Sequence, residues 1–370
     1  MKVLVTGGAG FIGSAFLNML VPRHPEHSFL CVDKLTYAGN PMSLDGLKTR
    51  GNFSLEIADI ADGPSVDRIF DAHRPEVVVH FAAETHVDRS IHDPGEFVRT
   101  NVVGTLALLN ASRALHKAGR SPEFRRFHHV STDEVYGSLA DEGAFTEDTR
   151  YDPSSPYAAS KASSDHLVRA FHRTYGLPTT ITNCSNNYGP RQAPEKLIPL
   201  TLLNALAGRE LPVYGQGRNK RDWLYVEDHC DAVWTVIERG AVGETYNVGG
   251  GEERSNIDVV RAICELVAEE SGAPRERLLA LIRFVEDRPG HDWRYAIDAS
   301  KIHRELGWAP RMRLATGLRS TLRWYMAHPE WVAAVQSGAH QAWLTTNYEH
   351  RLKSGRAADG TRKSSEGKDS

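Results

Sequence analysis

Short apolar segments alternate with amphipathic segments along the first half of the chain. The short segments are apolar almost throughout, which is typical of strands covered on both faces of a sheet. Strands separated by helices in this way indicate parallel βαβ units. The predicted strands are Lys2–Thr6, Phe29–Val32, Phe53–Ala58, Val77–Ala82, Phe127–Ser131 and Thr180–Cys184, and the predicted helices are Ser14–Leu20, Ser65–Ala72, Phe97–Ala118 and Ala158–Tyr175.

The pattern changes after about residue 186, where Pro and Gly interrupt the chain frequently. Further helices are predicted at Ile257–Ser271 and Gly317–Ala327, whereas Val226–Arg239 is a helix that could return to the first lobe. We therefore predict an α/β fold: a Rossmann-type doubly wound parallel sheet with a smaller mixed α/β lobe for the substrate. The sheet domain covers 1–186 with 226–240, the smaller lobe covers 187–225 and 241–350, and 351–370 form a polar, disordered tail.

Composition narrows the class of protein. The chain has 370 residues, 41% of them hydrophobic, and a formal net charge of −3. A general nucleic-acid binder would need a basic face, so nucleic acid is not an expected partner. No apolar run approaches the ~18 residues of a membrane helix, and no membrane partner is expected. The four cysteines are far apart and lack CxxC spacing, so we expect free thiols, a cytoplasmic location and no metal.

A glycine-rich segment joins the first predicted strand to the first predicted helix. Glycines at positions 7, 10 and 13 permit a tight turn, close approach of the backbone to a pyrophosphate, and close packing of the helix. The helix N-terminus then offers N–H donors and a positive dipole to the anion. The segment Gly7, Gly10, Phe11, Ile12 and Gly13 is therefore predicted to bind a dinucleotide.

An acidic residue, Asp33, ends the second predicted strand, 20 positions after Gly13. A carboxylate there hydrogen-bonds the ribose hydroxyls of NAD and repels a 2′-phosphate, so NAD is favoured over NADP although Lys34 is adjacent. Asp59 and Ile60 follow the third strand, where the adenine edge would lie. Lys34, Leu35 and Thr36 are assigned to the cofactor side with them.

Tyr157 and Lys161 are four residues apart on a predicted helix and share one face. An ammonium group beside a phenol favours the phenolate, so we expect a lowered pKa for Tyr157 and a base usable near neutrality. This pair is weak evidence alone. It gains weight from Thr132, Asp133 and Glu134, which end the strand just upstream, where parallel sheets place their ligands.

The segments TGGAGFIG, HFAAETHVDRS, STDEVYG, YAASK and NNYGP occur in this order along the chain. Together they resemble the extended short-chain dehydrogenase/reductase family, over Met1 to about Tyr348. Within that family, the pair Asp133-Glu134 resembles the nucleotide-sugar 4,6-dehydratases, in particular the branch that acts on thymidine-linked glucose. Related 4-epimerases typically lack the acidic pair.

The resemblance implies a role for each of these groups. Tyr157 takes the proton from the sugar C4 hydroxyl while a hydride passes from C4 to NAD. Thr132 hydrogen-bonds the same oxygen, and Lys161 holds the phenolate and a ribose hydroxyl. Glu134 then removes the C5 hydrogen, and protonated Asp133 donates to the departing C6 hydroxyl, since adjacent carboxyls push their pKa values apart. The hydride returns to C6, so NAD is regenerated and stays bound.

The smaller lobe needs point charges for a nucleotide diphosphate, because the helix N-terminus is already used by the dinucleotide. Lys196, Arg221 and Arg288 are the candidates from their loop-like settings. The resemblance adds further substrate-side residues and a cofactor-side set. The substrate-side residues are Thr85, Asn186, Leu197, Pro212, Tyr214, Asn256 and His291. The cofactor-side residues are Phe81, Ala82, Ala83 and Thr85. Three further residues are cofactor-side or structural: Thr100, Asn101 and Asn187.

Several alternatives stay open at this point. The helices Phe97–Ala118 and Ala158–Tyr175 carry apolar residues on more than one face, and the resemblance implies that they pair in a homodimer; internal packing in a monomer is the alternative. The function could also be that of an epimerase or decarboxylase with the same Tyr-Lys-NAD machinery. A non-catalytic NAD-binding sensor would have no use for the five reactive groups together. The nucleotide base and the pathway served stay undetermined.

Overall fold

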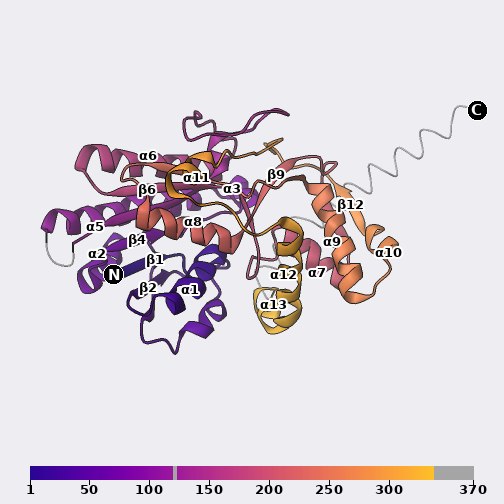
Figure 1. The fold of residues 1–370 in the computed structure, drawn as a ribbon, viewed down its shortest axis with the longest axis horizontal. Coiled ribbons are helices and arrows are strands. Elements are labelled where there is room, and N and C mark those ends of the chain that lie inside the picture. The colour runs from indigo at the N-terminus through magenta and orange to yellow at the C-terminus, as the bar shows by residue number, and fades with distance from the viewer. Residues whose placement is uncertain (120–122, 337–370) are drawn as a thin grey trace, which may run out of the picture.

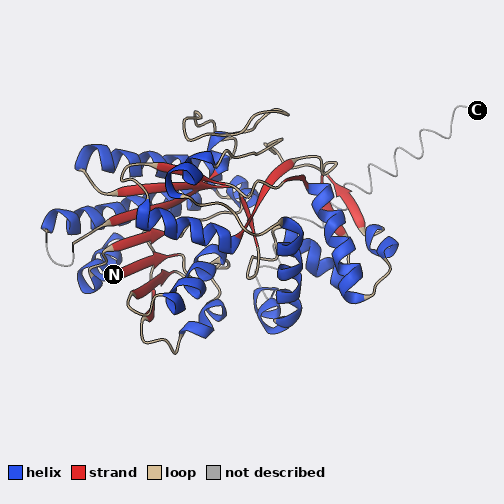
Figure 2. Cartoon of the chain, in the orientation of Figure 1, coloured by secondary structure: helices blue, strands red, loops and turns tan. Residues whose placement is uncertain are grey.

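A seven-stranded parallel sheet forms the larger part of the molecule. The computed structural model describes residues 1–119 and 123–336, so the predicted tail at 351–370 lies outside the described residues. The strand order is β10-β6-β5-β4-β1-β2-β3, and helices cover both faces (Figure 2). The strands are β1 (Lys2–Thr6), β2 (Ser28–Asp33), β3 (Phe53–Ile57), β4 (Val77–His80), β5 (Arg126–Thr132), β6 (Thr179–Cys184) and β10 (Thr245–Val248).

Alternate residues of each strand pack into different layers of the core. In β1, Val3 and Val5 pack with α1 (Phe11–Arg23) and α8 (Val226–Arg239), whereas Leu4 packs on the opposite face. This alternation follows from the two-residue period of a strand, and it explains why these strands are apolar throughout. The opposite face is covered by α2 (Gly63–His73), α5 (Thr105–Ala118) and α6 (Pro156–Tyr175). The predicted Rossmann-type architecture is confirmed.

The order of strands creates a topological switch between β1 and β4. From β1 the chain proceeds to β2 and β3, and from β4 it proceeds in the other direction to β5 and β6. The connecting segments therefore diverge at the carboxyl ends of β1 and β4, where open parallel sheets bind their ligands.

One boundary predicted from the sequence is wrong. Residues 241–350 were assigned to the smaller lobe, but β10 pairs in parallel with β6, from Thr245 opposite Ile181 to Val248 opposite Cys184. Helix α11 (Ser300–Leu306) packs on β10 and contributes to the same core cluster. The strand has only four residues between glycine-containing turns, which is too short for hydrophobic periodicity to reveal.

The helix predicted at Phe97–Ala118 is divided in the structure. Helix α4 (Pro94–Phe97) leads into a π-helical segment, η2 (Val98–Gly104), before α5 begins. Gly104 packs closely on Ile60, because a Cβ atom there would lie 2.7 Å from the Ile60 side chain. Wide helical turns of this kind occur often beside functional sites, and this segment carries Thr100 and Asn101.

The smaller lobe lies beside the carboxyl edge of the sheet, on the right of Figure 1, where its helices are labelled. It contains a three-stranded sheet of β7 (Asn186–Tyr188), β9 (Lys220–Tyr225) and β11 (Glu253–Ser255), and a pair of β8 (Leu211–Tyr214) and β12 (Ile282–Val285). Its helices are α7 (Leu197–Leu206), α9 (Asn256–Ser271), α10 (Arg275–Leu279), α12 (Leu314–Ala327) and α13 (Pro329–Gln336). Among the described residues, no helix combines the length and apolar character that crossing a membrane requires.

Candidate active site

A cavity of about 300 Å³ lies at the carboxyl edge of the large sheet, between the two lobes. Its lining begins at the glycine-rich turn after β1 and continues past the ends of β2, β4, β5 and β6 to the start of α7. The switch point of the strand order and the cavity therefore coincide, as expected for an open parallel sheet.

The glycine-rich turn needs its glycines for steric reasons. Gly7 has a φ of +70°, and a Cβ atom there would lie 2.6 Å from the backbone nitrogen of Ala82. A Cβ atom on Gly13 would lie 2.2 Å from the carbonyl oxygen of Gly7. The turn consequently presents bare backbone to the cavity at the N-terminus of α1, and this cradle suits a pyrophosphate.

Asp33 closes this end of the cavity. Its carboxylate accepts hydrogen bonds from the backbone N–H groups of Ala9 (2.9 Å) and Leu35 (2.8 Å), and burial raises its pKa above the ordinary value. Lys34 forms ion pairs with Glu96 at 3.0 Å and with Asp59 at 3.3 Å. Because those acids neutralise Lys34, it offers little attraction for a 2′-phosphate, which agrees with the preference for NAD predicted from Asp33.

The predicted cofactor residues lie together around this end, with one exception. Leu35 does not line the cavity; it adopts a left-handed φ of +53° and packs against the core under α1. The others all line the cavity: Gly7, Gly10, Phe11, Ile12, Gly13, Asp33, Lys34, Thr36, Asp59, Ile60, Phe81, Ala82, Ala83, Thr85, Thr100, Tyr157, Lys161 and Asn187.

The five reactive residues come from two elements that meet in the middle of the cavity. Thr132 ends β5, and Asp133 and Glu134 begin a 3₁₀ turn, η3 (Asp133–Tyr136), in which the Thr132 hydroxyl accepts a hydrogen bond from the Glu134 N–H at 3.3 Å. Tyr157 and Lys161 are presented by successive turns of α6. All five line the same cavity.

The two adjacent acids have different electrostatic surroundings. Burial, and then the neighbouring Glu134, raise the pKa of Asp133 well above its ordinary range. Burial also raises the pKa of Glu134, but the positive charges of Arg288, Lys196 and Arg221 oppose this effect. One oxygen of Asp133, Oδ2, is buried without a hydrogen-bond partner. The arrangement therefore favours a neutral Asp133 beside a more readily ionised Glu134.

The prediction for Tyr157 is wrong in its direction. Burial, followed by the negative charge of Glu134, raises the pKa of Tyr157 well above its ordinary value. The Lys161 ammonium donates to the Val130 carbonyl oxygen at 2.8 Å, and its Nζ lies 3.4 Å from His129 Nε2. The positive charge of Lys161 therefore does not offset the effect of burial and of Glu134 on the pKa of Tyr157.

The predicted substrate residues fall into two groups. Thr85, Thr132, Asp133, Glu134, Asn186 and Lys196 line the cavity itself. Lys196 donates to the Thr85 carbonyl oxygen at 3.1 Å and so connects the two lobes. The remaining predicted residues, Leu197, Pro212, Tyr214, Arg221, Asn256, Arg288 and His291, do not line it.

Within the second group, two arginines still act on the reactive centre. The charges of Arg221 and Arg288 both lower the pKa of Glu134. Arg221 is buried over the Tyr295 ring at 4.2 Å and donates to the Asp292 carbonyl oxygen at 2.9 Å. Arg288 has a buried Nε without a hydrogen-bond partner, a donor available to an anionic ligand.

The sequence reasoning missed one wall of the cavity. Residues 191–195 follow the NNYGP segment and line the cavity, and Glu195 among them lies 3.3 Å from Arg89. Trp331 and Val335 of α13 also line it, and Trp331 Nε1 donates to Ser43 Oγ at 3.0 Å. Position after a known motif could have revealed the first set, whereas nothing in the local sequence marks Trp331, which lies 288 positions from Ser43.

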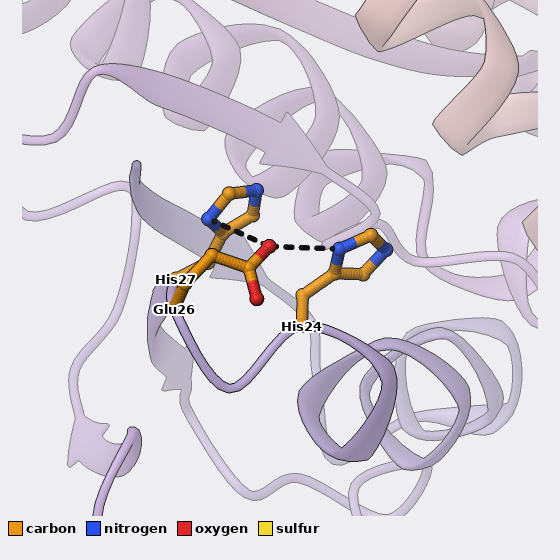
Figure 3. A group of neighbouring side chains, drawn as sticks. All are labelled: His24, Glu26 and His27. Atoms are coloured by element: carbon orange, nitrogen blue, oxygen red, sulfur yellow. Dashed lines mark hydrogen bonds and ion pairs between the residues drawn. The ribbon is translucent and has the colours of Figure 1, made fainter.

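A cluster of potential metal ligands lies at the opposite edge of the sheet, in the α1–β2 connection (Figure 3). The Glu26 carboxylate lies 3.2 Å from His24 Nδ1 and 3.5 Å from His27 Nδ1, and the Met1 amino group is 3.1 Å from His27 Nδ1. The imidazole rings stack at 5.2 Å and pack on Trp234. These groups bind one another, so the cluster is explained by packing.

The chain is similar to known nucleotide-sugar 4,6-dehydratases along most of its length. The family model for GDP-mannose 4,6 dehydratase matches residues 4–321. The chain is 55% identical over 363 residues to a dTDP-glucose 4,6-dehydratase of Shigella flexneri, covering 95% of this chain and 100% of the relative. It is 54% identical to a protein of the same name from Neisseria meningitidis, covering 92% and 97%.

Solved structures give the same result. The crystal structure of dTDP-glucose 4,6-dehydratase from Bacillus anthracis in complex with NAD has a TM-score of 0.81 and 42% identity, covering 90% of this chain and 99% of that one. A UDP-glucose 4-epimerase from Thermotoga maritima has a TM-score of 0.79 and 30% identity, covering 89% and 100%. The chain therefore belongs to the GDP-mannose 4,6-dehydratase family, within the extended short-chain dehydrogenases/reductases.

Proposed function

We propose that the protein is an NAD-dependent dTDP-glucose 4,6-dehydratase, which converts dTDP-glucose to dTDP-4-keto-6-deoxyglucose. The observation that carries this proposal is the pair Asp133-Glu134 at the end of β5. Asp133 is buried and Glu134 half-buried, and both line the cavity that also holds Tyr157 and Lys161. Oxidation at C4 needs only a base and a hydride acceptor. An additional acid and base in the same cavity serve the elimination of water.

The first step is the removal of the C4 hydroxyl proton. Tyr157 accepts this proton as phenolate, which is a minor form at neutral pH because the pKa of Tyr157 is raised. Thr132 orients the same oxygen through a hydrogen bond, and the positive charge of Lys161 favours the phenolate. When bound, NAD would supply the acceptor for the C4 hydride and the donor of the hydride to C6. The glycine turn and Asp33 hold it, since the bare backbone at Gly7 and Gly13 fits a pyrophosphate and the buried carboxylate suits a ribose.

The second step is the elimination of water across C5 and C6. The C4 ketone acidifies the C5 hydrogen, and Glu134 removes it as general base. Asp133 remains protonated because its pKa is raised by burial and by Glu134, and its free Oδ2 is suited to protonate the departing C6 hydroxyl. A proton then returns to C5 while the hydride returns to C6.

The smaller lobe holds the nucleotide. Lys196, Arg221 and Arg288 supply the positive charges that face the sugar end, and they suit a diphosphate. We place Tyr214, Asn256 and His291 on the nucleotide side, together with the apolar residues Leu197 and Pro212. The Tyr214 and His291 rings lie 6.1 Å apart in a T-shaped arrangement. The relatives that the chain resembles are named for a dTDP-sugar, and this supports thymidine as the base.

We further propose a homodimer that acts in the cytoplasm. Val98, Val103, Leu106 and Tyr175 are exposed apolar residues on η2, α5 and α6, the helices predicted to pair. All four cysteines are buried free thiols, as suits a reducing compartment. Light scattering of the purified protein tests the dimer, and a monomeric mass would contradict it.

The purified protein should convert dTDP-glucose without added NAD, and the product mass is the measurement. Loss of one water establishes both the dehydratase and its resident cofactor. An unchanged mass with an isomerised sugar would identify a 4-epimerase and contradict the role given to Asp133 and Glu134. UDP-glucose, tested in parallel, reports the preference for the base.

A further inference from the structure

Helix α6 carries four functional side chains at intervals of four residues: Tyr157, Lys161, Asp165 and Arg169. Residues at this spacing lie along one face of a helix. The proposed function uses the first two. Asp165 has 0% of its surface exposed and does not line the cavity. Burying a charged carboxylate costs free energy, so this one must be stabilised by neighbouring donors or positive charges.

A neutral imidazole separates Asp165 from Lys161. His129 Nε2 on β5 lies 3.4 Å from Lys161 Nζ and 3.2 Å from Asp165 Oδ1. A single nitrogen cannot accept from Lys161 and donate to Asp165 together, and Asp165 Oδ1 has no hydrogen-bond partner among the described residues, so the imidazole is a spacer between the two charges. His129 is also 0% exposed. Burial lowers its pKa to about 4, so the ring carries no charge at neutral pH. The order ammonium, imidazole, carboxylate therefore extends from the cavity wall into the protein interior.

The carboxylate itself is held firmly. Asp165 Oδ2 accepts hydrogen bonds from Ser131 Oγ and from the Tyr151 hydroxyl, each at 2.8 Å. Arg169 donates to the same Tyr151 hydroxyl at 2.8 Å. Contacts with His129 and Lys161 keep the pKa of Asp165 below its ordinary value although burial opposes this. Asp165 is consequently a fixed negative charge behind Lys161.

Few other charges act on Lys161. Burial lowers its pKa to about 8, and Asp165 is the strongest of the groups that raise it. The other titratable groups near Lys161 are neutral at pH 7, because burial lowers the pKa of His80 and raises those of Cys184 and Tyr157. Near Asp165, Tyr136 and Tyr151 are also neutral phenols, and Arg169 contacts the Tyr151 hydroxyl. Of these groups, Asp165 is the only negative charge.

We propose that Asp165 is a positioning residue whose negative charge, acting past the neutral His129 ring, keeps Lys161 charged and in place at the cavity wall near Tyr157. A direct salt bridge would draw the ammonium away from the cavity, whereas the intervening imidazole leaves it at the cavity wall. The inference rests on the proposed function only for the role of Lys161 in the reaction.

A purely structural role for Asp165 makes a different prediction. Through Ser131 and through Asn183, whose amide donates to the Thr132 carbonyl oxygen at 3.0 Å, Asp165 also fixes the end of β5. Loss of that support would lower activity by the same factor at every pH. Loss of the charge would lower activity most where Lys161 begins to lose its proton.

The test compares Asp165→Asn with Tyr151→Phe, a matched control that removes one hydrogen bond to the same carboxylate and leaves its charge. We expect the alkaline limb of the kcat profile to move at least about one pH unit lower in Asp165→Asn, as for loss of a nearby opposite charge. At pH 8, kcat should fall about fivefold for a shift of one unit, with a much smaller loss at pH 6.5. Tyr151→Phe should keep the wild-type limb. A uniform loss across pH, or no change, overturns the proposal.

A second readout does not depend on the substrate. Formaldehyde with cyanoborohydride methylates neutral amines, and peptide mass gives the pH at which half of Lys161 reacts. Asp165→Asn should lower that pH by about one unit, even if dTDP-glucose proves not to be the substrate. An unchanged midpoint overturns the proposal. Asp165→Ser, with the same expected shift, replaces Asp165→Asn if that variant does not fold.

Discussion

The two ends of the cavity differ in which groups line them: backbone groups at one end and charged side chains at the other. The cofactor end is mainly backbone at the Gly7–Gly13 turn, with the carboxylate of Asp33 and the ion pair of Lys34 with Asp59. The sugar end is made of charged side chains, and it combines Asp133 and Glu134 with cations from the other lobe. A backbone cradle depends on local steric fit, whereas a set of side-chain charges depends on how two lobes meet. Changes at the two ends should therefore affect separate properties.

The largest expected effect is at the sugar end. Asp133→Asn removes the acid for the C6 hydroxyl, and elimination should slow by about 10²–10⁴-fold. NAD content should stay normal, and C4 oxidation should continue, so absorbance of NADH at 340 nm should accumulate after mixing with dTDP-glucose. Equal loss of oxidation and elimination would contradict the division of roles between Asp133 and Tyr157.

The second effect belongs to the cofactor end. Gly13→Ala would place a Cβ atom 2.2 Å from the Gly7 carbonyl oxygen, a backbone atom that cannot move alone. We expect the NAD content of the purified protein to fall at least about tenfold, with a lower melting temperature from the steric strain. Gly51→Ala is the control, since a Cβ atom there meets nothing within 4 Å. Normal NAD content in Gly13→Ala would show that the close contact is not required.

A smaller effect separates binding from chemistry at the sugar end. Arg288→Gln removes a charge that faces Glu134 and a buried donor suited to the diphosphate. The KM for dTDP-glucose should rise about tenfold, as for loss of one charge-assisted hydrogen bond, while NAD content stays unchanged. Arg283→Gln, which removes an ion pair to Glu210 on the surface, is the control. A loss of NAD in Arg288→Gln would contradict the view that the sugar end and the cofactor end of the cavity control separate properties.

The smallest effect concerns stability. Because the folded pKa of Asp133 is raised, the folded protein binds this proton more tightly than the unfolded chain, and Asp133 destabilises the fold as pH rises above about 4. Asp133→Asn should therefore be more stable than the wild type at pH 8, by about 1 kcal/mol or more, with no gain near pH 4. Thermal melts at both pH values measure this, and an equal gain at both would assign the effect to packing.

The difference between the two ends also explains what the sequence could predict. The cofactor end lies in contiguous segments whose glycines and Asp33 have fixed spacings, and of the residues assigned to the cofactor only Leu35 does not line the cavity. The sugar end needed the resemblance, because the side chains of Arg221 and Arg288 meet Glu134 only after both lobes have folded. The direction of the Tyr157 pKa shift could not be read from the spacing to Lys161, because burial and the Glu134 charge outweigh that neighbour. Strand β10 was not predicted because its four residues are too few to show a hydrophobic periodicity.

The hydrogen bond from Trp331 to Ser43 has a consequence for the order of assembly during synthesis. The glycine turn and Asp33 leave the ribosome early, but Trp331 and Val335 add their part of the cavity wall almost 300 positions later. A nascent chain can therefore form the cradle for NAD well before that cradle is enclosed. Firm retention of the cofactor should begin only when α13 has packed against the rest of the cavity wall. Tightly bound NAD would then indicate that the chain has folded completely.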